Sequence, residues 1–516
     1  MRSFYPALGP ASQSRRATDR VKHVRAGPSP RRPHWLCVAY AFPPINRSGT
    51  HRTLGFVRHL DRLGWDATVL TVIPRGEPLD ESLVREVPPS TTVLRTPWVN
   101  PIERIKSLFP LNGRRGTRQP AMASRVPGGP HASELALLGS VREWLSQLLI
   151  TPDARVAWVG PAVRAGLNAI RQRRPDLIYS TSPYMSAHLI ALVLSRWTHL
   201  PWVADFRDPW RGNPFRSLGF ESLERWDSLL EWLVLRSTTH IVCCTPTMTQ
   251  QLRRRHPFTA NKSTTILNGF DRERSDRIRP TRIAPADHFV LTHCGQFYGP
   301  RSPKIWFAAL RRALRQAPQL AGKIHIALIG SQEFEGRSLR EWAAQEGVSD
   351  CVRVLGQKSH SETLSHMVGS DALILAGSAG VGGELQIPNK LYEYLAVRRP
   401  IIAACSSASP VVSILNEARA EAVVCDPADE QALARAITQL ATDRHVNVVD
   451  AWNGVDQFDR ARRAGELEEV FRSLSRRRRS GRGLVLKSAT MPARTAVPGQ
   501  LAPTGPSLIV SDDTSL

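Results

Sequence analysis

Long hydrophobic runs, a secretory signal and paired cysteines are all missing from this sequence. No uninterrupted apolar stretch reaches the roughly 18 residues that a membrane span requires. The first residues scatter arginine among Pro, Ser and Gly instead of placing an apolar core after a basic start. The seven cysteines form no Cys-x-x-Cys pair and have no histidine at a metal-ligand spacing. We therefore expect a cytoplasmic protein with buried free thiols.

The sequence does have an excess of positive charge, with a formal net charge of +24. About half of the excess lies at the two ends, because residues 1–33 hold eight Lys and Arg against one Asp, and residues 472–516 hold eight against two. The remainder favours anionic partners, such as phosphorylated substrates or an acidic membrane surface. Aromatic residues do not interleave with the basic runs, so nucleic acid is not an expected partner.

The chain is too long, at 516 residues, for one ordinary hydrophobic core, and we expect two main domains. Short apolar runs alternate with helical segments, which is typical of parallel sheets built from βα units. The ends are rich in Pro, Ser and Arg and are expected to be disordered. The predicted divisions are a basic tail (1–33), a first domain (34–271) with an irregular insertion at about 74–175, a linker (272–287), a second domain (288–456), a closing helix (457–474) and a second basic tail (475–516).

Both domains open with the same order of strand, loop and helix. In the first, the apolar run WLCVAYAF precedes a loop with two prolines and a helix from about 50 to 63, and the strand DATVLTV follows. In the second, FVLTHCG, a helix from about 303 and IHIALIG repeat this order. We therefore predict an α/β protein with two Rossmann-like, doubly wound domains whose strand ends face an interdomain cleft.

One segment of the irregular insertion is amphipathic. Residues 133–150 place leucines and a valine on one side of a helix, with Arg142, Glu143 and Gln147 off that side. The pattern fits a helix that covers the core. In a protein as basic as this one, it also fits a helix that lies on an anionic membrane face.

Two loops of the first domain carry residues suited to ligand binding. In FPPINRSGTHR, Gly49 would let the backbone approach a bound group, and Arg52 adds positive charge at the start of a helix. In ADFRDPW, Asp205 and Arg207 lie on one side of an extended segment, and Asp208 precedes a proline. These groups could bind or deprotonate hydroxyls. Alternatively, the first loop is only a turn, and the second is tied by a local ion pair.

Two loops of the second domain suit an anion. In CGQFYGPRSPKIW, Gly295 follows a strand, and the cations Arg301 and Lys304 near the next helix start suit a diphosphate better than they suit the helix dipole. In AGSAGVGGELQIPNK, several glycine amides and a helix start converge, as a phosphate site requires. Lys390 and Glu393 share nearly one helix face and could read a charged group and a sugar hydroxyl side by side, although such pairs are also common on surfaces.

Taken in order, these segments resemble the retaining glycosyltransferases of family 4, which have the two-domain GT-B fold. The resemblance covers roughly residues 34–474 and is most specific in RDPW and KLYEYLA. It is carried by YAFPPINRSGTHR, TPDARVAWVGPA, PDLIYSTSPYMSAHLIA, VADFRDPW, ILNGFD, HCGQFYGPRSP and IPNKLYEYLAVRRPIIA. The resemblance implies that the second domain binds a nucleotide-diphosphate sugar and that the first presents an acceptor.

The resemblance also implies roles for individual residues. Glu393 stands where the family's glutamate holds the donor ribose, and Glu384 lies one residue from the place of a first glutamate, which is Leu385 here. Gln296 replaces a family arginine, whereas Arg301 keeps a cation near the diphosphate. The predicted site residues are Gly49, Gly295, Arg301, Gly382, Gly383, Glu384, Lys390 and Glu393 for the donor, Arg52, Asp205 and Arg207 for the acceptor, and Asp208, His188 and Glu393 as catalytic candidates.

The predicted activity is transfer of a hexose-type residue from the nucleotide sugar to a glycan or lipid-linked acceptor, in cell-envelope or surface-polysaccharide synthesis. The nucleotide sugar is a co-substrate, and no further cofactor is expected. Because the sequence has no Asp-x-Asp run, we predict transfer without a metal ion, whereas retention of configuration is implied by the resemblance alone. A nucleotide-sugar epimerase of related architecture and a catalytically inactive scaffold are the alternatives. Association with the cytoplasmic membrane face is a further hypothesis.

Overall fold

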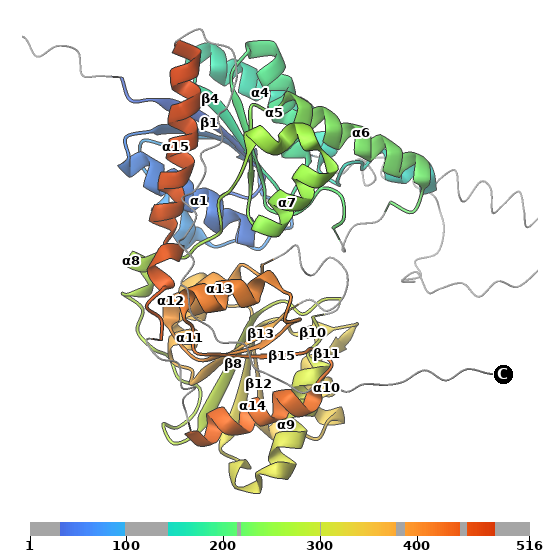
Figure 1. Ribbon diagram of the computed structural model, residues 1–516, viewed down its shortest axis with the longest axis vertical. Coiled ribbons are helices and arrows are strands. Elements are labelled where there is room, and N and C mark those ends of the chain that lie inside the picture. Colours follow the sequence, from blue (N-terminus) through green and yellow to red (C-terminus); the bar gives the residue numbers. More distant parts are fainter. Residues whose placement is uncertain are drawn as a thin grey trace, which may run out of the picture.

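Two parallel sheets, each with helices packed on it, form the two halves of the molecule (Figure 1). The computed structural model describes residues 31–98, 143–213, 218–299, 301–377, 387–443 and 451–479. The blue-to-green elements form the N-terminal domain, and the yellow-to-orange elements form the C-terminal domain. This arrangement confirms the predicted α/β architecture of two Rossmann-like domains.

The N-terminal domain is built on a seven-stranded parallel sheet with the order β3-β2-β1-β4-β5-β6-β7. Helices cover both faces of its central strands, which are therefore buried along their whole length instead of on one face only. The strands are β1 (His34–Ala39), β2 (Asp66–Val72), β3 (Thr92–Thr96), β4 (Leu177–Thr181), β5 (Trp202–Phe206), β6 (His240–Cys243) and β7 (Ser263–Thr265). The helices are α1 (Ser48–Arg62), α4 (Val159–Gln172), α5 (Ser186–Thr198), α6 (Glu221–Ser237) and α7 (Pro246–Arg255), with short 3₁₀ turns η1 (Glu81–Glu86), η2 (Val156–Trp158) and η3 (Pro257–Lys262).

The C-terminal domain has a six-stranded parallel sheet with the order β12-β9-β8-β13-β14-β15 and a small antiparallel hairpin, β10-β11. Its strands are β8 (Phe289–Gly295), β9 (Ile324–Gly330), β10 (Glu333–Phe334), β11 (Arg337–Ser338), β12 (Val352–Gly356), β13 (Ala372–Ala376), β14 (Ile401–Ala404) and β15 (Ala422–Cys425). The helices are α8 (Arg272–Ser275), α9 (Lys304–Gln316), α10 (Leu339–Gln345), α11 (His360–Val368), α12 (Lys390–Val397), α13 (Pro410–Ala418), α14 (Glu430–Asp443) and α15 (Arg460–Arg479), with η4 (Pro318–Leu320), η5 (Ser349–Cys351) and η7 (Val455–Phe458).

The strand order reverses at the centre of each sheet. In the N-terminal sheet, β1 lies between β2 and β4, and in the C-terminal sheet β8 lies between β9 and β13. Loops that leave neighbouring strands on opposite sides of such a reversal open a crevice at the carboxyl ends of the strands. Residues from the loops after β1 and β8 line one cavity between the domains, so the two crevices face each other.

The last helix returns to the N-terminal domain. Phe471 of α15 packs 5.4 Å from Trp35 and 6.0 Å from Tyr179, measured between ring centroids. At the start of the helix, a side chain on Gly55 of α1 would collide with Arg460, since an ideal Cβ would lie 1.9 Å from its Cδ. Gly55 therefore permits the close contact of α1 with α15, which ties the two domains together (Figure 1).

Two regular elements, β3 and α4, lie within the stretch 74–175, which the sequence pattern predicts to be irregular apart from a helix at 133–150. Strand β3 is partly exposed at the edge of the sheet and therefore lacks a continuous apolar run. Helix α4 begins with Gly160 and Pro161 and contains Gly166, residues that weaken a helical pattern. Gly166 is needed because an ideal Cβ there would lie 2.8 Å from a methyl group of Leu194 on α5.

All seven cysteines are free and buried, as expected. Across the described ranges, none of the helices has the length and apolar content to span a bilayer. The predicted helix at 133–150 is described only from residue 143 onward, where residues 143–148 are helical. The terminal stretches 1–30 and 480–516, together with Gly382, Gly383 and Glu384, lie outside the described residues.

Candidate active site

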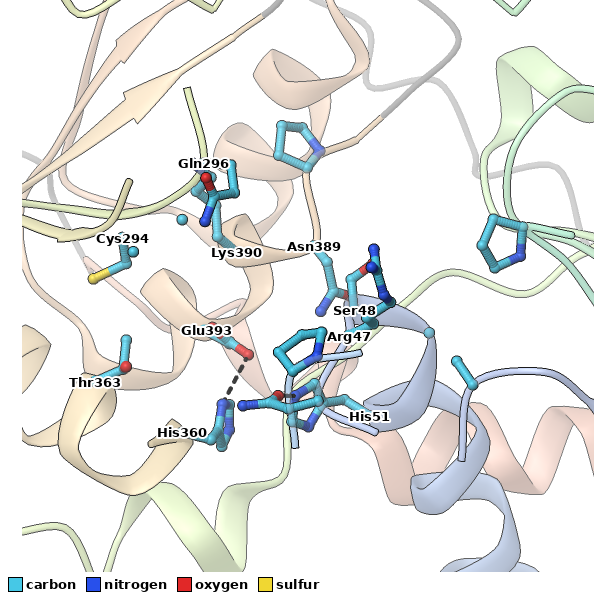
Figure 2. A pocket seen from close by; sticks show the side chains of 18 of the residues that line it. Arg47, Ser48, His51, Cys294, Gln296, His360, Thr363, Asn389, Lys390 and Glu393 are labelled. Carbon is cyan, nitrogen blue, oxygen red and sulfur yellow. Dashed lines mark hydrogen bonds and ion pairs between the residues drawn. The ribbon is translucent and has the colours of Figure 1, made fainter. Parts of the chain in front are cut away.

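A cavity of about 800 Å³ lies between the two domains. The N-terminal domain contributes the loop after β1, the start of α1 and the loop after β5. The C-terminal domain contributes the end of β8 with its following loop, the loop after β12 and the start of α12 (Figure 2). The volume is in the range of small-molecule binding sites, and both walls carry cationic side chains.

The start of α1 and Arg207 form the N-terminal wall. An ideal Cβ on Gly49 would lie 2.5 Å from Nη1 of Arg207, so the guanidinium lies directly against the first turn of the helix. Its hydrogen bonds to the carbonyl of Ser182 and to Oγ of Ser48 are long, at 3.4 and 3.3 Å. A helix start and a buried cation with weak protein partners together suit an anion.

Arg47 also lines the cavity, immediately before α1. Its guanidinium pairs with Glu77, a buried carboxylate that also accepts hydrogen bonds from Tyr40 (2.9 Å) and Arg155 (3.0 Å). The guanidinium of Arg155 lies 3.8 Å from the ring centroid of Trp98. This network holds Arg47 at the mouth of the cavity while its side chain stays 46% exposed.

Lys390 enters the C-terminal wall beside Gly295. The φ angle of Gly295 is +111°, a conformation that side chains disfavour, and an ideal Cβ would lie 3.2 Å from Nζ of Lys390. Burial, followed by the charge of Arg301, lowers the pKa of Lys390 to about 7. The neutral amine is therefore poised to gain a proton when an anion binds next to it.

His293 holds Lys390 in place. Its Nδ1 lies 3.2 Å from the carbonyl oxygen of Ile374, and its Nε2 lies 3.2 Å from Nζ of Lys390. Because a carbonyl only accepts, Nδ1 carries the proton and Nε2 accepts from Lys390. Burial and the neighbouring charge of Lys390 lower the pKa of His293 well below its usual value, which keeps the ring neutral.

Glu393 and two stacked histidines form the floor of the cavity (Figure 2). A carboxylate oxygen of Glu393 lies 3.7 Å from Nδ1 of His360, and the ring of His360 stacks on His51 of the other domain with centroids 4.3 Å apart. Burial raises the pKa of Glu393 to about 7. Burial also lowers the pKa of His51 to about 3 and that of His360 well below its usual value, so the stack is uncharged at neutral pH.

Arg301 and Asp208 face the cavity from opposite domains. Arg301 is 7% exposed, and its guanidinium lies 5.1 Å from the ring centroid of Tyr298. Burial raises the pKa of Asp208, an effect that the charges of Arg207 and Arg301 oppose. Lys304 pairs with Glu335 at 2.6 Å, and both side chains are exposed, which agrees with the alternative of a surface charge.

Several of the predicted site residues gather at this cavity. They are Gly49, Arg207, Asp208, Gly295, Arg301, Lys390 and Glu393. They come from four separate loops and helix starts, which the fold brings together at the domain interface. Their functional roles stay predictions.

His188 does not reach the cavity. It is fully buried on α5, its Nδ1 lies 2.8 Å from Oγ of Ser180, and its ring packs on Phe206. Burial lowers its pKa to about 3, so it stays uncharged. The prediction that His188 binds or deprotonates an acceptor is therefore wrong, because α5 turns this residue toward the sheet.

Arg52 and Asp205 are also misassigned as acceptor ligands. The two side chains form a bidentate pair at 2.8 and 3.0 Å, and both are buried. Tyr179 and Thr181 donate to the same carboxylate, while Arg52 also donates to the carbonyls of residues 266 and 267. Both groups are fully occupied within the protein. The strand β5 ends at Phe206, so Arg207 turns toward the cavity and Asp205 toward α1.

Among the site residues that were not predicted from the sequence are Arg47, His51, His293 and His360. Arg47 and His51 lie in the same loop and helix start as Gly49, and this proximity in the sequence could have identified them as site residues. His360 follows β12 and meets His51 only through the contact between the domains. No spacing along the chain could have connected these two rings.

Two family models match successive parts of the chain. The model described as Glycosyltransferase Family 4 matches residues 119–274, and the model described as Glycosyl transferases group 1 matches residues 288–443. The chain carries two glycosyltransferase domains. The first matched region contains Arg207 and Asp208 of the cavity, and the second contains Arg301, Lys390 and Glu393.

Solved structures share the GT-B glycosyltransferase fold at low sequence identity. A glycosyltransferase from Rickettsia africae ESF-5 is 12% identical with a TM-score of 0.54, over 86% of this chain and 98% of that chain. Sucrose-phosphate synthase from Thermosynechococcus elongatus is 16% identical with a TM-score of 0.54, over 86% and 99%. Anabaena Alr3699/HepE, solved with UDP, is 14% identical with a TM-score of 0.52, over 86% and 100%. No curated protein sequence matches this chain.

Proposed function

We propose that this glycosyltransferase moves a hexose-type residue from a nucleotide-diphosphate sugar to a glycan or lipid-linked acceptor in cell-envelope or surface-polysaccharide synthesis. The observation that carries the proposal is the convergence of cations from both domains on one cavity, with Arg207 against α1 on one wall and Arg301 and Lys390 on the other. A diphosphate matches such a set in charge and in the number of acceptor oxygens. HepE, which shares the fold, has been solved with UDP and with UDP-glucose, and this supports a donor of that class.

The cationic walls would act on the leaving group. During transfer, the bond between the anomeric carbon and the diphosphate oxygen breaks, and negative charge develops on the departing nucleoside diphosphate. Amides at the start of α1 and the charges of Arg301 and Lys390 are already fixed around that position. They stabilise the developing charge more in the transition state than in the ground state.

Glu393 and Asp208 would bind hydroxyl groups on the two sides of the donor. The carboxylate of Glu393, in the first turn of α12, lines the cavity and would accept hydrogen bonds from the donor ribose. On the N-terminal side, Asp208, which lines the cavity, would accept the proton of the acceptor hydroxyl as the hydroxyl oxygen bonds to the anomeric carbon. Burial raises the pKa of both carboxyls, which makes each a stronger base.

Retention of configuration, transfer without a metal ion and a cytoplasmic location are parts of the same proposal. The first follows from the family resemblance, and the second from the lack of an Asp-x-Asp run in the sequence. Nuclear magnetic resonance of the product anomer tests retention, because an inverted anomer would contradict it. Activity that is lost with EDTA and restored by Mg²⁺ or Mn²⁺ would contradict metal independence.

A ligand screen tests the donor class. The melting temperature is measured with UDP, GDP, UDP-glucose and uridine, because a ligand that binds the native state raises it. We expect a rise with at least one diphosphate and none with uridine. Glu393→Ala should lose donor turnover and keep the fold, whereas Glu341→Ala, at an exposed position of α10, should retain activity. Equal turnover in both variants would contradict the proposal.

Product analysis separates the alternatives. The protein is incubated with a labelled nucleotide sugar without an acceptor, and the sugar is recovered and identified. A transferase releases a small amount of the unchanged sugar through hydrolysis, whereas an epimerase yields the epimer. An inactive scaffold yields neither product.

A further inference from the structure

Helix α6 presents an unusual outer face. Trp226, Leu229 and Trp232 recur every three residues and are 43%, 44% and 43% exposed. The solvent side of a helix in a globular protein normally carries charged and polar residues at these positions. Helix α6 lies on the outer side of the N-terminal domain, away from the C-terminal domain (Figure 1).

Neighbouring elements extend this apolar surface. Trp197, at the end of α5, is 68% exposed, and the adjacent Arg196 donates to Ser237 at the end of α6 (3.4 Å). At the other end of α6, Trp144 donates to Ser222 (2.9 Å) and holds the segment 143–150 beside the helix. We call Leu145, Leu149, Trp197, Trp226, Leu229 and Trp232 the α6 face. It contains every tryptophan that is more than 36% exposed among the described residues.

Three of the four acidic residues of α6 point away from this face. Asp227 accepts a hydrogen bond from the indole of Trp210 (3.0 Å), Glu231 faces Arg255 and His256, and Glu224 accepts from the backbone of Leu218 (3.1 Å). Glu221 is exposed at the first turn and pairs with Arg225 at 2.7 Å. Two of the three exposed charges of α6, Arg225 and Arg236, are therefore positive.

The layer beside α6 has the same sign. The sequences of α4 and α5 contain no Asp or Glu, and their exposed charged side chains are arginines. Exposed basic residues next to the α6 face are Arg225 and Arg236 on α6, Arg196 beside Trp197, and Arg174, which donates to the carbonyl of Thr198 (3.0 Å). The exposed acidic residues there are Glu143 and Glu221, and Glu221 is paired with Arg225. A symmetric contact with a second copy of the chain would bring these cations close to one another, which is unfavourable. An anionic partner would instead be attracted by these arginines.

We propose that the α6 face is a docking surface for an anionic phospholipid membrane. Tryptophan side chains prefer the headgroup level of a bilayer, where the ring is partly buried and the indole N–H stays hydrated. Arginines around them interact with lipid phosphates. The apolar residues supply insertion and the cations supply attraction, the two components of interfacial binding. This inference extends the proposed function and is tested without a nucleotide sugar, so either can fail alone.

Vesicle flotation of the full-length chain tests the proposal. Phosphatidylcholine vesicles with and without phosphatidylglycerol are compared, using wild type, Trp226→Ser/Trp232→Ser and the control Phe258→Ser, which alters an exposed aromatic residue on η3. We expect wild type and control to float with the anionic vesicles, and the double variant to bind about tenfold more weakly, because the tryptophans supply the insertion. The melting temperature and its rise with UDP should stay unchanged, since both side chains are exposed.

Three results would overturn the proposal. The first is no flotation of the wild type with anionic vesicles. The second is equal flotation of the double variant, which would assign binding to the basic ends of the chain. The third is a concentration-dependent dimer in sedimentation that the double variant abolishes, because the α6 face would then bind a second copy.

Discussion

Nζ of Lys390 lies 3.2 Å from Nε2 of His293, whose Nδ1 faces the carbonyl oxygen of Ile374. This chain of contacts connects the β13 backbone to the cation that we place against the donor diphosphate. The neutral imidazole accepts a hydrogen bond from the ammonium and holds it in position, but it does not neutralise the positive charge. Its ring stacks on Phe297 with centroids 4.1 Å apart, so the histidine itself has little freedom.

The first prediction concerns His293. In His293→Asn, the shorter amide can still donate to Ile374 but cannot reach Lys390. We expect the affinity for UDP or the preferred diphosphate to fall about tenfold, the value of one charged hydrogen bond. Calorimetry measures the dissociation constant, and His288→Asn, at a partly exposed position outside the cavity, serves as the control. Unchanged affinity in His293→Asn would show that Lys390 needs no such support.

The second prediction concerns pH. Burial and the charge of Arg301 place the pKa of Lys390 at about 7, and a bound diphosphate favours the protonated amine. Affinity should therefore be highest below pH 7 and decline as the pH rises through 7 and the free enzyme loses this proton. Glu393 titrates in the same range, so the measurement is made in Glu393→Gln.

Calorimetry in buffers of different ionisation enthalpy should detect proton uptake on binding in this background. Adding Lys390→Met should remove both the uptake and the pH dependence. An affinity that rises with pH, or uptake that persists without Lys390, would contradict the second prediction.

The third prediction concerns the approach of α1 to Arg207. In Gly49→Ala, the new methyl group would lie 2.5 Å from Nη1 of Arg207 and 3.2 Å from Cβ of Ala41, so the guanidinium must move away from the helix start. We expect a roughly tenfold loss in kcat/KM for donor turnover, about 1.4 kcal/mol of transition-state stabilisation. Gly160→Ala is the matched control, because nothing lies within 4 Å of its new Cβ. Equal loss in both variants would point to a general effect on folding.

The fourth prediction tests the corrected role of Arg52 and Asp205. Burial alone would raise the pKa of Asp205, but the guanidinium of Arg52 holds it below the usual value. Arg52→Met leaves this carboxylate buried without its partner and should lower the free energy of unfolding by about 3–5 kcal/mol. Arg62→Met on the same helix breaks an exposed pair with Glu273 and should cost less than about 1 kcal/mol.

Urea unfolding measures both variants. If Arg52 instead bound the acceptor, Arg52→Met would raise the KM for the acceptor while leaving the free energy of unfolding unchanged.

The sequence predicted the sheets well because most of their strands are short, mainly apolar runs separated by recognisable helix starts. It also predicted the cavity residues that lie on such boundaries: Gly49 at the start of α1, Gly295 at the end of β8, and Lys390 with Glu393 in the first turn of α12. The carboxyl ends of parallel strands lie at one edge of the sheet, so the loops that follow them reach the same cavity. The position is fixed by the fold class.

The remaining residues depend on packing that the sequence pattern does not encode. Asp205 and Arg207 share one side of an extended segment, yet the chain turns after Phe206 and separates them. His188 lies in the first turn of α5, close in sequence to a loop at the cavity, yet its side chain points toward β4 and β5. The stack of His51 on His360 exists only because the two domains meet, so no local pattern could reveal it.

The most direct test of the account is a crystal structure of the protein with a bound nucleoside diphosphate, UDP or whichever diphosphate gives the largest thermal shift. The account predicts the diphosphate between the first turn of α1 and the C-terminal wall, with phosphate oxygens about 3 Å from Nζ of Lys390 or the guanidinium of Arg301. It predicts the ribose hydroxyls at Glu393. A nucleotide bound outside this cavity, or bound within it with the phosphates away from both cations, would contradict the central claim.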